Sequence, residues 1–441
     1  MSGKYREYPE YVDSGVAWLG DVPAHWEPIR FKYRLFEKKK TFNSELEAGS
    51  ISFGRVIYKS SENLDPATKA SYQEVLEREF LINPLNMNYD LLSLRTALSE
   101  INVVVSTGYI VVRSDQRLVK RYVRWLLQEF DVAHMKTLGS GVRQTINYMD
   151  IGNSFFCEPT KFEQEKIANF LDHETAKIDT LIEKQQQLIA LLKEKRQAVI
   201  SHAVTKGLHP DAPMRDSGVE WLGEVPEHWE VVKIKYIAEL TPKKSEIEAI
   251  KDQTCNFIPM EKLKKDFLLL DEVRTISDVF DGYTYFRDED LLIAKVTPCF
   301  ENQNMVVARN LKNGIGFGSS EIYVLREKVP KLNDFLYYRL QEDVFMEMGA
   351  GSMTGAGGLK RVPSDFLNNF IMALPPENER LDIIDYILKY TLKFDELMNK
   401  ADGAIGLMQE RRTALISAAV TGKIDVRNWL LPEETKNMDV A

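Results

Sequence analysis

The chain has 441 residues, of which 44% are hydrophobic and 28% are charged, and its formal net charge is −9. This composition is typical of a globular protein with two or three domains and excludes a disordered chain. No apolar run approaches the roughly 20 residues of a membrane-spanning helix, and the N-terminus lacks the apolar core of a secretory signal, so we expect a cytoplasmic protein.

A short motif near the N-terminus occurs again in the second half of the chain. Residues 13–27 read DSGVAWLGDVPAHWE and residues 216–230 read DSGVEWLGEVPEHWE. Twelve of these fifteen positions are identical, at an offset of 203 residues. His25 and His228 are equivalent in the two copies, each followed by tryptophan, and we interpret them as parts of a structural turn rather than as catalytic groups. The repeat indicates that the chain carries the same unit twice.

A basic stretch follows the first motif. Between Arg30 and Lys40 there are six basic residues and one acid. The net charge of the chain is acidic, which is unusual for a nucleic-acid-binding protein, but a local basic face is sufficient for contact with phosphates. The basic stretch therefore predicts a contact surface for a nucleic acid.

The first variable region continues with a strand, a helix and a glycine-rich loop. Residues 102–113 are rich in β-branched and aromatic side chains and predict a strand. Residues 119–130 predict an amphipathic helix, with basic side chains on its outer face. The glycine-rich loop at 139–141 is followed by Arg143. We expect this loop to expose polar and basic side chains.

A long helix comes next, over residues 162–205. Its apolar side chains recur at alternating steps of four and three residues, which is the heptad spacing of a coiled coil. A helix of this length spans about 66 Å, at about 1.5 Å per residue. Charge covers its other faces, so the apolar side requires a partner.

The same pattern returns at an offset of 216 residues, where residues 379–423 align on 163–207 without gaps. The simplest partner of each helix is therefore the other copy. The alternative is that each helix packs on its own domain. The apolar positions with this spacing, which we call the helix seam, are Ile167, Leu171, Ile178, Leu181, Leu188, Leu192, Val199, Ile383, Ile387, Phe394, Leu397, Met408 and Leu415.

The second variable region has the same outline as the first. Residues 322–325 predict a strand, residues 334–345 predict a helix, and a glycine-rich segment follows at 349–358. Lys360 and Arg361 come directly after it. The sequence therefore repeats the order of short motif, variable region and long helix.

No catalytic signature is complete. The Gly-x-Gly-x-Gly string at 314–318 lacks an acidic ribose partner and predicts a turn, and the segment at 349–358 lacks the ending of a P-loop. No Asn/Asp-Pro-Pro-aromatic motif of an amino-methyltransferase is present. The acids Glu289 and Asp290 near Lys295 leave a metal-dependent nuclease as a minor alternative. The three cysteines are far apart and show no metal-binding spacing, so we expect no catalytic or metal-binding residues.

The duplicated motifs resemble those of the specificity subunits of type I restriction–modification enzymes, the HsdS family. The resemblance rests on the string DSGVxWLGxVPxHW and on the helix beginning at Glu163-Gln164. In the second variable region, residues 294–302 and 316–321 are similar to segments of target-recognition domains. Two positions depart from the family pattern: the first helix lacks a second proline before Glu163, and Arg380 stands where glutamine is expected.

The resemblance implies a mixed α/β fold, in which two similar target-recognition domains are separated by a pair of long antiparallel coiled-coil helices, with an internal pseudo-two-fold repeat. The expected segments are 1–158 (first domain), 159–207 (first helix), 208–374 (second domain), 375–424 (second helix) and 425–441 (tail). The resemblance also implies double-stranded DNA, two methyltransferase subunits and two restriction subunits as partners. S-adenosylmethionine, ATP and Mg²⁺ are expected on those partners, with no cofactor on this chain.

Side chains that can donate to bases and phosphates are the candidate DNA contacts. They are Lys38, Lys39, Lys40, Arg143, Gln144 and Asn147 in the first region, and Lys295, Asn302, Gln303, Lys360 and Arg361 in the second. Two other functions remain as alternatives. A coiled-coil scaffold would need no basic face, and a self-sufficient DNA methyltransferase or nuclease would need a cofactor loop or a metal site.

Overall fold

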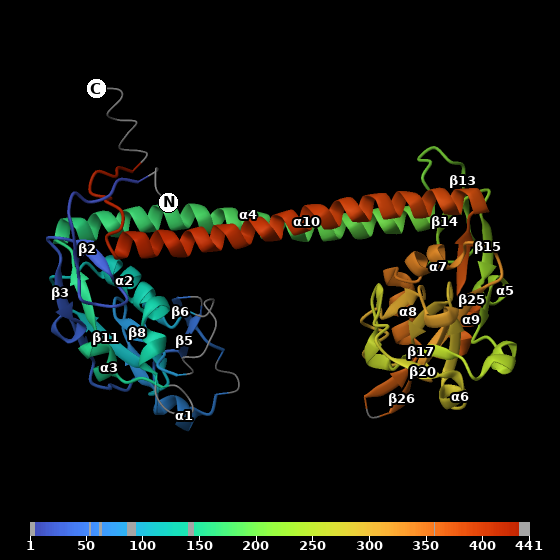
Figure 1. Cartoon of the computed structure of the whole chain (residues 1–441), viewed down its shortest axis with the longest axis horizontal. Helices are drawn as coiled ribbons and strands as arrows, with labels where there is room; N and C mark the ends of the chain where they lie inside the picture. The colour runs from blue at the N-terminus through green and yellow to red at the C-terminus, as the bar shows by residue number, and fades with distance from the viewer. Residues whose placement is uncertain are drawn as a thin grey trace. The chain divides into compact units, whose positions relative to one another are not determined.

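The computed structural model of the chain describes residues 5–52, 54–60, 64–85, 94–139, 145–356 and 358–431 (Figure 1). The chain forms two compact units. The first contains residues 1–186 and 402–441, and the second contains residues 187–401. The two long helices, α4 (Lys161–Lys206) and α10 (Glu377–Val420), each contribute one half to each unit.

A six-stranded sheet forms the centre of the first unit, in the order β4-β11-β8-β9-β6-β5. Residues 102–113, predicted as one strand, form two, because β10 pairs with β7 while β11 joins the larger sheet. The strands are β1 (Tyr11–Asp13), β2 (Asp21–Pro23), β3 (Glu27–Arg30), β4 (Leu35–Glu37), β5 (Gly49–Ser52), β6 (Arg55–Tyr58), β7 (Gln73–Val75), β8 (Phe80–Ile82), β9 (Thr96–Leu98), β10 (Val103–Val105), β11 (Ile110–Ser114) and β12 (Phe155–Glu158). The helices are α1 (Pro66–Ala70), α2 (Lys120–Ala133) and α3 (Tyr148–Asn153), with short 3-10 turns at Phe31–Tyr33 and Met135–Leu138.

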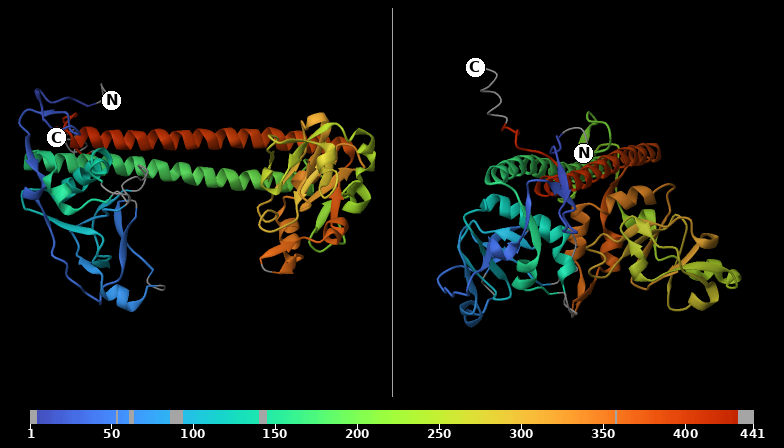
Figure 2. Two further views of the ribbon diagram at one scale, coloured as in Figure 1. Left: turned by 60° about the horizontal axis from the view of Figure 1, so that its bottom comes forward. Right: turned by 60° about the vertical axis from the view of Figure 1, so that its left-hand side comes forward.

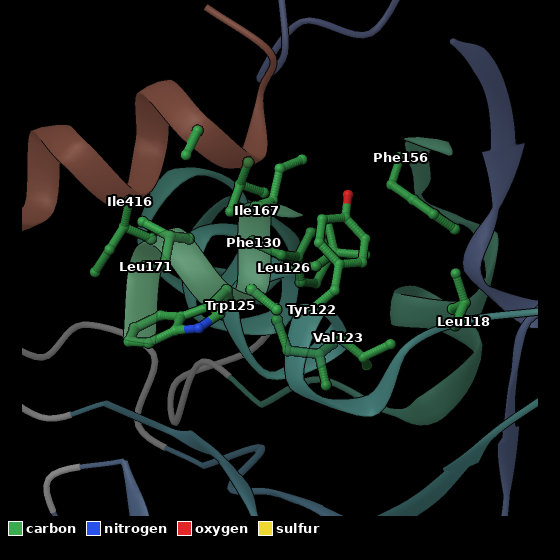
Figure 3. Packing of buried hydrophobic residues seen from close by; sticks show 14 of the residues in the cluster. Leu118, Tyr122, Val123, Trp125, Leu126, Phe130, Phe156, Ile167, Leu171 and Ile416 are labelled. Carbon is green, nitrogen blue, oxygen red and sulfur yellow. The ribbon is translucent and has the colours of Figure 1, made fainter. Parts of the chain in front are cut away.

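Helix α2 connects this sheet to the long helices. Its buried face includes Val123, Leu126 and Phe130, as the amphipathic pattern predicts. Figure 3 shows this face against Ile167 and Leu171 of α4, with Ile416 of α10 beside them. The core of the first unit therefore contains side chains from both copies of the repeat.

The duplicated motif fastens the domain to the start of the long helix. In the first unit, the buried carboxylate of Glu163 lies 2.8 Å from His25 Nε2 and accepts from Trp26 Nε1 at 3.4 Å. The same carboxylate accepts from the Thr160 backbone N–H at 3.0 Å and the Thr160 hydroxyl at 2.7 Å, which caps the helix. His25 and Trp26 thus attach the motif to the start of α4, which is a structural role, as the sequence predicts. We call this contact between a motif and the start of a long helix a joint.

The C-terminal end of each long helix packs on the motif of the other copy. In the first unit, Lys423 Nζ donates to the Asp21 carbonyl at 2.6 Å, and Tyr11 donates to the Gly422 carbonyl at 3.1 Å. Gly422 is at φ +74°, and a Cβ there would lie 2.4 Å from Pro23. The residues after α10 continue into the core, where Trp429 packs edge-to-face on Phe170. Part of the expected tail is therefore folded.

Two four-stranded sheets form the second unit, in the orders β16-β25-β22-β23 and β20-β17-β24-β21. The strands are β13 (Met214–Asp216), β14 (Glu224–Pro226), β15 (Glu230–Lys233), β16 (Ala238–Leu240), β17 (Thr254–Ile258), β18 (Leu263–Lys264), β19 (Phe267–Leu268), β20 (Val273–Thr275), β21 (Thr284–Arg287), β22 (Leu291–Ala294), β23 (Met305–Val307), β24 (Ile315–Gly318), β25 (Ile322–Glu327), β26 (Thr354–Ala356), β27 (Leu359–Arg361) and β28 (Ile371–Leu374). The helices are α5 (Ile234–Ile237), α6 (Ile276–Val279), α7 (Asn333–Arg339), α8 (Asp343–Gly351) and α9 (Ser364–Asn369), with 3-10 turns at Lys244–Ile250, Met260–Lys262 and Lys312–Gly314.

Two local predictions in this unit are wrong. The predicted helix at 334–345 is two helices, because Glu342 adopts an extended backbone and its carboxylate accepts a hydrogen bond from Ser201 of α4. The Gly-x-Gly-x-Gly string at 314–318 is largely a buried strand, β24, rather than a turn. A Cβ on Gly316 would lie 2.1 Å from the Phe286 ring, so glycine there permits close packing between neighbouring strands.

The second joint repeats the first with one change. Glu379 lies 2.7 Å from His228 Nε2 and accepts from Trp229 Nε1 at 3.0 Å. In the first joint, Gln164 accepts from the Val119 N–H and donates to the Pro159 carbonyl. Its counterpart is Arg380.

Arg380 cannot accept a hydrogen bond, so it donates in both of its contacts. It donates to the Pro375 carbonyl at 2.8 Å, which is the equivalent of Pro159, and to the Pro330 carbonyl at 3.0 Å. The start of this helix therefore remains anchored although Arg380 stands where the family pattern has glutamine. The second contact is with a backbone carbonyl, whereas that of Gln164 is with a backbone N–H.

The two long helices lie side by side and run antiparallel within each unit (Figure 2). Ile178 of α4 packs in one core with Leu415 of α10, and Ile383 and Ile387 of α10 pack in another core with Ile200 and Val204 of α4. Each long helix thus packs on the other helix and contributes to the cores of both units. Within the described ranges, no helix combines the length and apolar character that a membrane span requires.

The residues of the helix seam are not equally buried. Ile167, Leu171, Ile178, Ile383, Ile387, Phe394 and Leu415 are buried, and Leu192, Val199 and Met408 are half-buried. Contrary to the expectation, Leu181, Leu188 and Leu397 are exposed, with 50%, 43% and 40% of their surface accessible. These three are outside the cores that the helices share with the domains, and a helix pair alone covers only one side of each side chain.

Candidate nucleic-acid interface

The three consecutive lysines that follow β4 have different environments. Lys38 Nζ lies 3.1 Å from Glu74 Oε1 and 3.0 Å from Glu79 Oε2, and only 6% of its side chain is exposed. Together with Thr41 and Asn43, Lys38 outweighs the opposing effect of burial and lowers the pKa of Glu74. Lys38 is therefore a buried structural cation and cannot contact DNA in this structure, which is a correction to the sequence prediction.

Lys39 and Lys40 are exposed beside it. Lys40 Nζ donates to the Thr107 carbonyl at 3.0 Å, in the turn between β10 and β11. Phe42 nearby is 60% exposed. This surface combines ammonium groups, an aromatic ring and a turn, which can contact phosphates and stack on a base. Phe42 was missed in the sequence, although its position next to the basic stretch is a usable signal.

The other candidates of the first region follow the glycine-rich loop. Arg143 and Gln144 lie outside the described residues. Asn147 is exposed, but its side-chain oxygen accepts from the backbone N–H of Met149 at 2.8 Å and of Asp150 at 3.2 Å. Asn147 therefore caps α3, and this capping role accounts for its position at the start of that helix.

In the second unit, the glycine-rich segment after α8 forms a hairpin of β26 and β27. The Thr297 hydroxyl donates to the Gly358 carbonyl at 2.8 Å and accepts from the Lys360 N–H at 3.0 Å. This pairing fixes the hairpin against the segment after β22. Lys360 and Leu359 are exposed on the hairpin. Thr297 was missed in the sequence, where nothing connects it to a segment some sixty residues away.

Arg361 and Lys295 lie at the base of this hairpin. Arg361 donates to both carboxylate oxygens of Glu321 at 2.8 Å, and this ion pair raises the pKa of Arg361 and lowers that of Glu321. Lys295 Nζ lies 5.1 Å from the centroid of the Tyr323 ring. Arg361 thus anchors the hairpin, while Lys295 and Lys360 place two further cations beside it.

Asn302 and Gln303 follow the same segment. Asn302 is exposed. Gln303 accepts from Lys265 Nζ at 2.6 Å through its side-chain oxygen, and its side-chain nitrogen donates to the Gln341 carbonyl at 3.4 Å. Asn302 therefore has a side chain available to a ligand, whereas both polar atoms of Gln303 are already used within the domain.

Two of the three cysteines are inaccessible and weakly reactive. Cys157 and Cys255 are buried, and burial raises the pKa of each thiol to about 11. Thiols with such pKa values are almost entirely protonated at neutral pH and are poor nucleophiles. Within the part of the chain that the structure describes, no three His, Cys, Asp or Glu side chains are grouped closely enough to hold a metal ion.

Comparison with known proteins finds similarity to specificity subunits of type I restriction enzymes, although no protein-family model matches the chain. The chain is 33% identical over 198 residues to the specificity subunit of the type I restriction enzyme EcoEI from Escherichia coli, which covers 44% of this chain and 33% of that protein. It is 37% identical over 183 residues to the EcoAI specificity subunit from the same organism, covering 41% and 29%. The matched part thus spans about a third of the length of these two relatives.

A third relative is similar over most of its length. The MjaVIII specificity subunit from Methanocaldococcus jannaschii is 21% identical over 443 residues, which covers 92% of this chain and 95% of that protein.

Solved structures have the same fold. A chain from a structure of a type I restriction–modification system, described for its assembly and conformational transition, superposes with a TM-score of 0.67 at 13% identity over 91% of this chain and 99% of that one. The HsdS subunit from Thermoanaerobacter tengcongensis gives a TM-score of 0.52 at 14% identity, over 91% and 98%. With its duplicated motifs and its two long helices, the chain is thus similar in sequence to type I restriction enzyme specificity subunits and has the fold of these two solved structures.

Proposed function

We propose that the chain is the DNA sequence-specificity subunit of a type I restriction–modification complex. Each of its two α/β domains recognises one half of a bipartite DNA target. The observation that carries this proposal is the duplication itself, since the same joint, through Glu163 and through Glu379, attaches a different domain to each long helix. Two different domains on a repeated frame suit a target with two different half-sites.

The chain performs no chemistry in this proposal. It docks two methyltransferase subunits and two restriction subunits in the cytoplasm, and S-adenosylmethionine, ATP and Mg²⁺ bind to those partners. The exposed apolar residues Leu181, Leu188 and Leu397 of the long helices are consistent with protein docking there. The two domains remain free to contact double-stranded DNA.

The proposed DNA contacts follow from side-chain availability. Lys39, Lys40, Asn302 and Lys360 are exposed, and Lys295 is half-buried beside the hairpin of β26 and β27. Asparagine can read an adenine edge with two hydrogen bonds, whereas lysines contact guanine or phosphates. We therefore assign base reading to Asn302 and Lys360, and phosphate contact to Lys39 and Lys40.

The test is methylation by the assembled complex. The chain is expressed with the methyltransferase of its own gene neighbourhood, and the modified bases are mapped by sequencing. A single split motif is expected. No modification by a folded, assembled complex, or modification without sequence preference, would contradict the proposal.

Variants then separate the two kinds of contact. Asn302→Ala is expected to lose about 1–3 kcal/mol of binding on the mapped motif only, whereas Lys39→Ala should lose affinity equally on all sequences. Gln303→Ala is the matched control, because the side chain of Gln303 is occupied within the domain. Equal losses for Asn302→Ala on specific and random DNA would assign Asn302 to the phosphate backbone.

A further inference from the structure

A cavity of about 570 Å³ in the first unit lies between β6, α2 and the two long helices. Three arginines from distant parts of the sequence line it: Arg55 of β6, Arg124 of α2 and Arg412 of α10. The same three arginines line an adjoining cavity of about 380 Å³. The fold thus brings three guanidinium groups to one concave surface.

The acids around this cavity already have partners. Asp179 pairs with Arg412 at 2.8 Å, and Asp172 accepts from Arg121 at 2.6 Å and from Trp125 Nε1 at 2.8 Å. Glu129 accepts from the Ser417 hydroxyl at 2.7 Å. Asp179 and Asp172 are therefore paired with arginines, Glu129 is hydrogen-bonded to a neutral hydroxyl, and Glu183 also lines the adjoining cavity.

Arg55 and Arg124 have no such partner. Among the described residues, no carboxylate lies within ion-pairing distance of either guanidinium. The Arg124 guanidinium lies over the Trp125 ring, 4.8 Å from its centroid. That ring contact orients the group, and its hydrogen-bond donors remain available to a ligand.

The charge of Arg124 is electrostatically unfavourable where it stands. Burial lowers the pKa of Arg124, and the neighbouring Arg55 and Arg412 lower it further, against the opposing effect of Asp172 and Glu100. Arginine nevertheless stays protonated in proteins. A bound anion would offset both the burial and the repulsion.

The second unit offers an internal comparison. A cavity of about 400 Å³ there is lined by Arg196, Ile200 and Asp395, which correspond through the repeat to Arg412, Ile416 and Asp179. Its arginines are paired, Arg196 with Asp395 at 3.6 Å and Arg309 with Asp334 at 2.6 Å. Arg412 is paired with Asp179 in the same way, so the first cavity differs from the second in its two further arginines, Arg55 and Arg124.

We propose that Arg55 and Arg124, next to the ion pair of Arg412 with Asp179, form a phosphate-binding site in the first unit. Guanidinium groups bind phosphate oxygens through paired, charge-assisted hydrogen bonds. The hydroxyl of Ser52 on the cavity wall adds a neutral donor. The phosphate can belong to a DNA backbone or to a free phosphate compound, and the inference rests on the proposed function only for the DNA source.

The experiment uses the full chain and three variants. Arg55→Gln and Arg124→Gln remove one guanidinium each, and Arg117→Gln, at an exposed position outside the cavity lining, is the control with the same charge change. Arg55 is exposed, so Arg55→Gln keeps the test valid if Arg124→Gln unfolds the domain. Each protein is titrated with inorganic phosphate and with ATP by calorimetry, and with a duplex DNA of unrelated sequence by fluorescence anisotropy at several salt concentrations.

A DNA phosphate is indicated if duplex affinity falls about tenfold in Arg55→Gln and Arg124→Gln but not in Arg117→Gln. The slope of log affinity against log salt should then decrease by about 0.9 for each lost phosphate contact. A free phosphate compound is indicated if wild type and Arg117→Gln bind phosphate or ATP and the cavity variants do not.

Equal behaviour of Arg55→Gln and Arg117→Gln in both titrations would overturn the site. Failure of the proposed function is a separate result. It would appear as absent or unspecific methylation, whereas these titrations need neither a methyltransferase nor a recognised sequence.

Discussion

Arg412 Nε of α10 lies 2.8 Å from Asp179 Oδ1 of α4, and the repeat-related atoms of Arg196 and Asp395 lie 3.6 Å apart. Each long helix thus gives its aspartate to one ion pair and its arginine to the other. Each pair lies within one unit, where it joins the first half of one helix to the second half of its neighbour. The repeat in the sequence is therefore also a reciprocal contact in the structure.

A double-mutant cycle with Asp179→Asn and Arg412→Gln should give a coupling free energy of about 0.2–1 kcal/mol, because half of the Asp179 side chain is exposed. Arg412→Gln alone should cost more than Asp179→Asn, since the Arg412 guanidinium also lies 5.9 Å from the Trp125 ring centroid. Urea unfolding at low and high salt measures both quantities. A coupling of zero at low salt would show that the pair does not hold the helices together.

Substitution of Glu163 should cause a larger loss of stability. Glu163→Ala removes the acceptor of Thr160, His25 and Trp26 at a site where only 2% of the glutamate side chain is exposed, and should destabilise the first unit by more than about 2 kcal/mol. Glu379→Ala is the matched control from the second joint. It should cost less, because 16% of the Glu379 side chain is exposed. Equal costs in thermal unfolding would contradict this ranking.

The Glu163 carboxylate should also make the stability of the first unit depend on pH. Burial raises the pKa of Glu163, but the hydrogen bonds from Thr160, His25 and Trp26 outweigh it, and the folded pKa is lowered. An acid whose pKa is lowered in the folded state contributes stability above its unfolded pKa of about 4.3. This contribution is lost as the pH falls through the folded-state pKa. The stability difference between wild type and Glu163→Gln should therefore shrink below about pH 4. A constant difference would show that the carboxylate charge is not the cause.

The long helices and α2 could be predicted from the sequence because their evidence is local. Apolar side chains at heptad spacing specify a helix wherever it packs, and the predicted range of 162–205 differs from α4 by one residue at each end. The break near Glu342 and the strand at 314–318 could not be predicted, because a contact with Ser201 and the space needed by Phe286 decide them. Both contacts join residues that are distant in the sequence or belong to different strands.

In the candidate site, too, the sequence does not predict the environment of each side chain. Lys38, Lys39 and Lys40 have the same chemistry and adjacent positions, so the sequence cannot rank them. Burial ranks them in the structure, because the end of β4 directs Lys38 toward Glu74 and Glu79 and leaves Lys39 exposed. One of these three adjacent lysines is therefore a structural cation.

Substitution of two neighbouring lysines tests this difference. Lys38→Ala leaves Glu74 and the buried Glu79 without their shared cation, and should destabilise the first unit by about 3 kcal/mol. Lys39→Ala should change stability by less than about 0.5 kcal/mol and should weaken DNA binding instead. Thermal unfolding and DNA titration of both variants are the measurements. Weaker DNA binding by a fully stable Lys38→Ala would return Lys38 to the interface.

Asp131 on α2 should make the stability of the first unit depend on pH in the opposite direction. Burial raises the pKa of Asp131 to about 6, although a hydrogen bond from the Arg95 backbone N–H and the charges of Arg95 and Lys136 oppose the shift. An acid whose folded pKa is raised contributes most below its unfolded pKa. Its contribution is lost as the pH rises through the folded value.

Asp131→Asn should therefore stabilise the first unit at pH 7.5 by roughly 1–3 kcal/mol and have little effect at pH 4, where both side chains are neutral. The asparagine oxygen can still accept from the Arg95 N–H, so the change removes the charge without removing that hydrogen bond. Unfolding at both pH values, with Asp211→Asn at an exposed position as the control, measures the effect. If Asp131→Asn is less stable than wild type at pH 7.5, the ionised carboxylate contributes more through Arg95 and Lys136 than its burial costs.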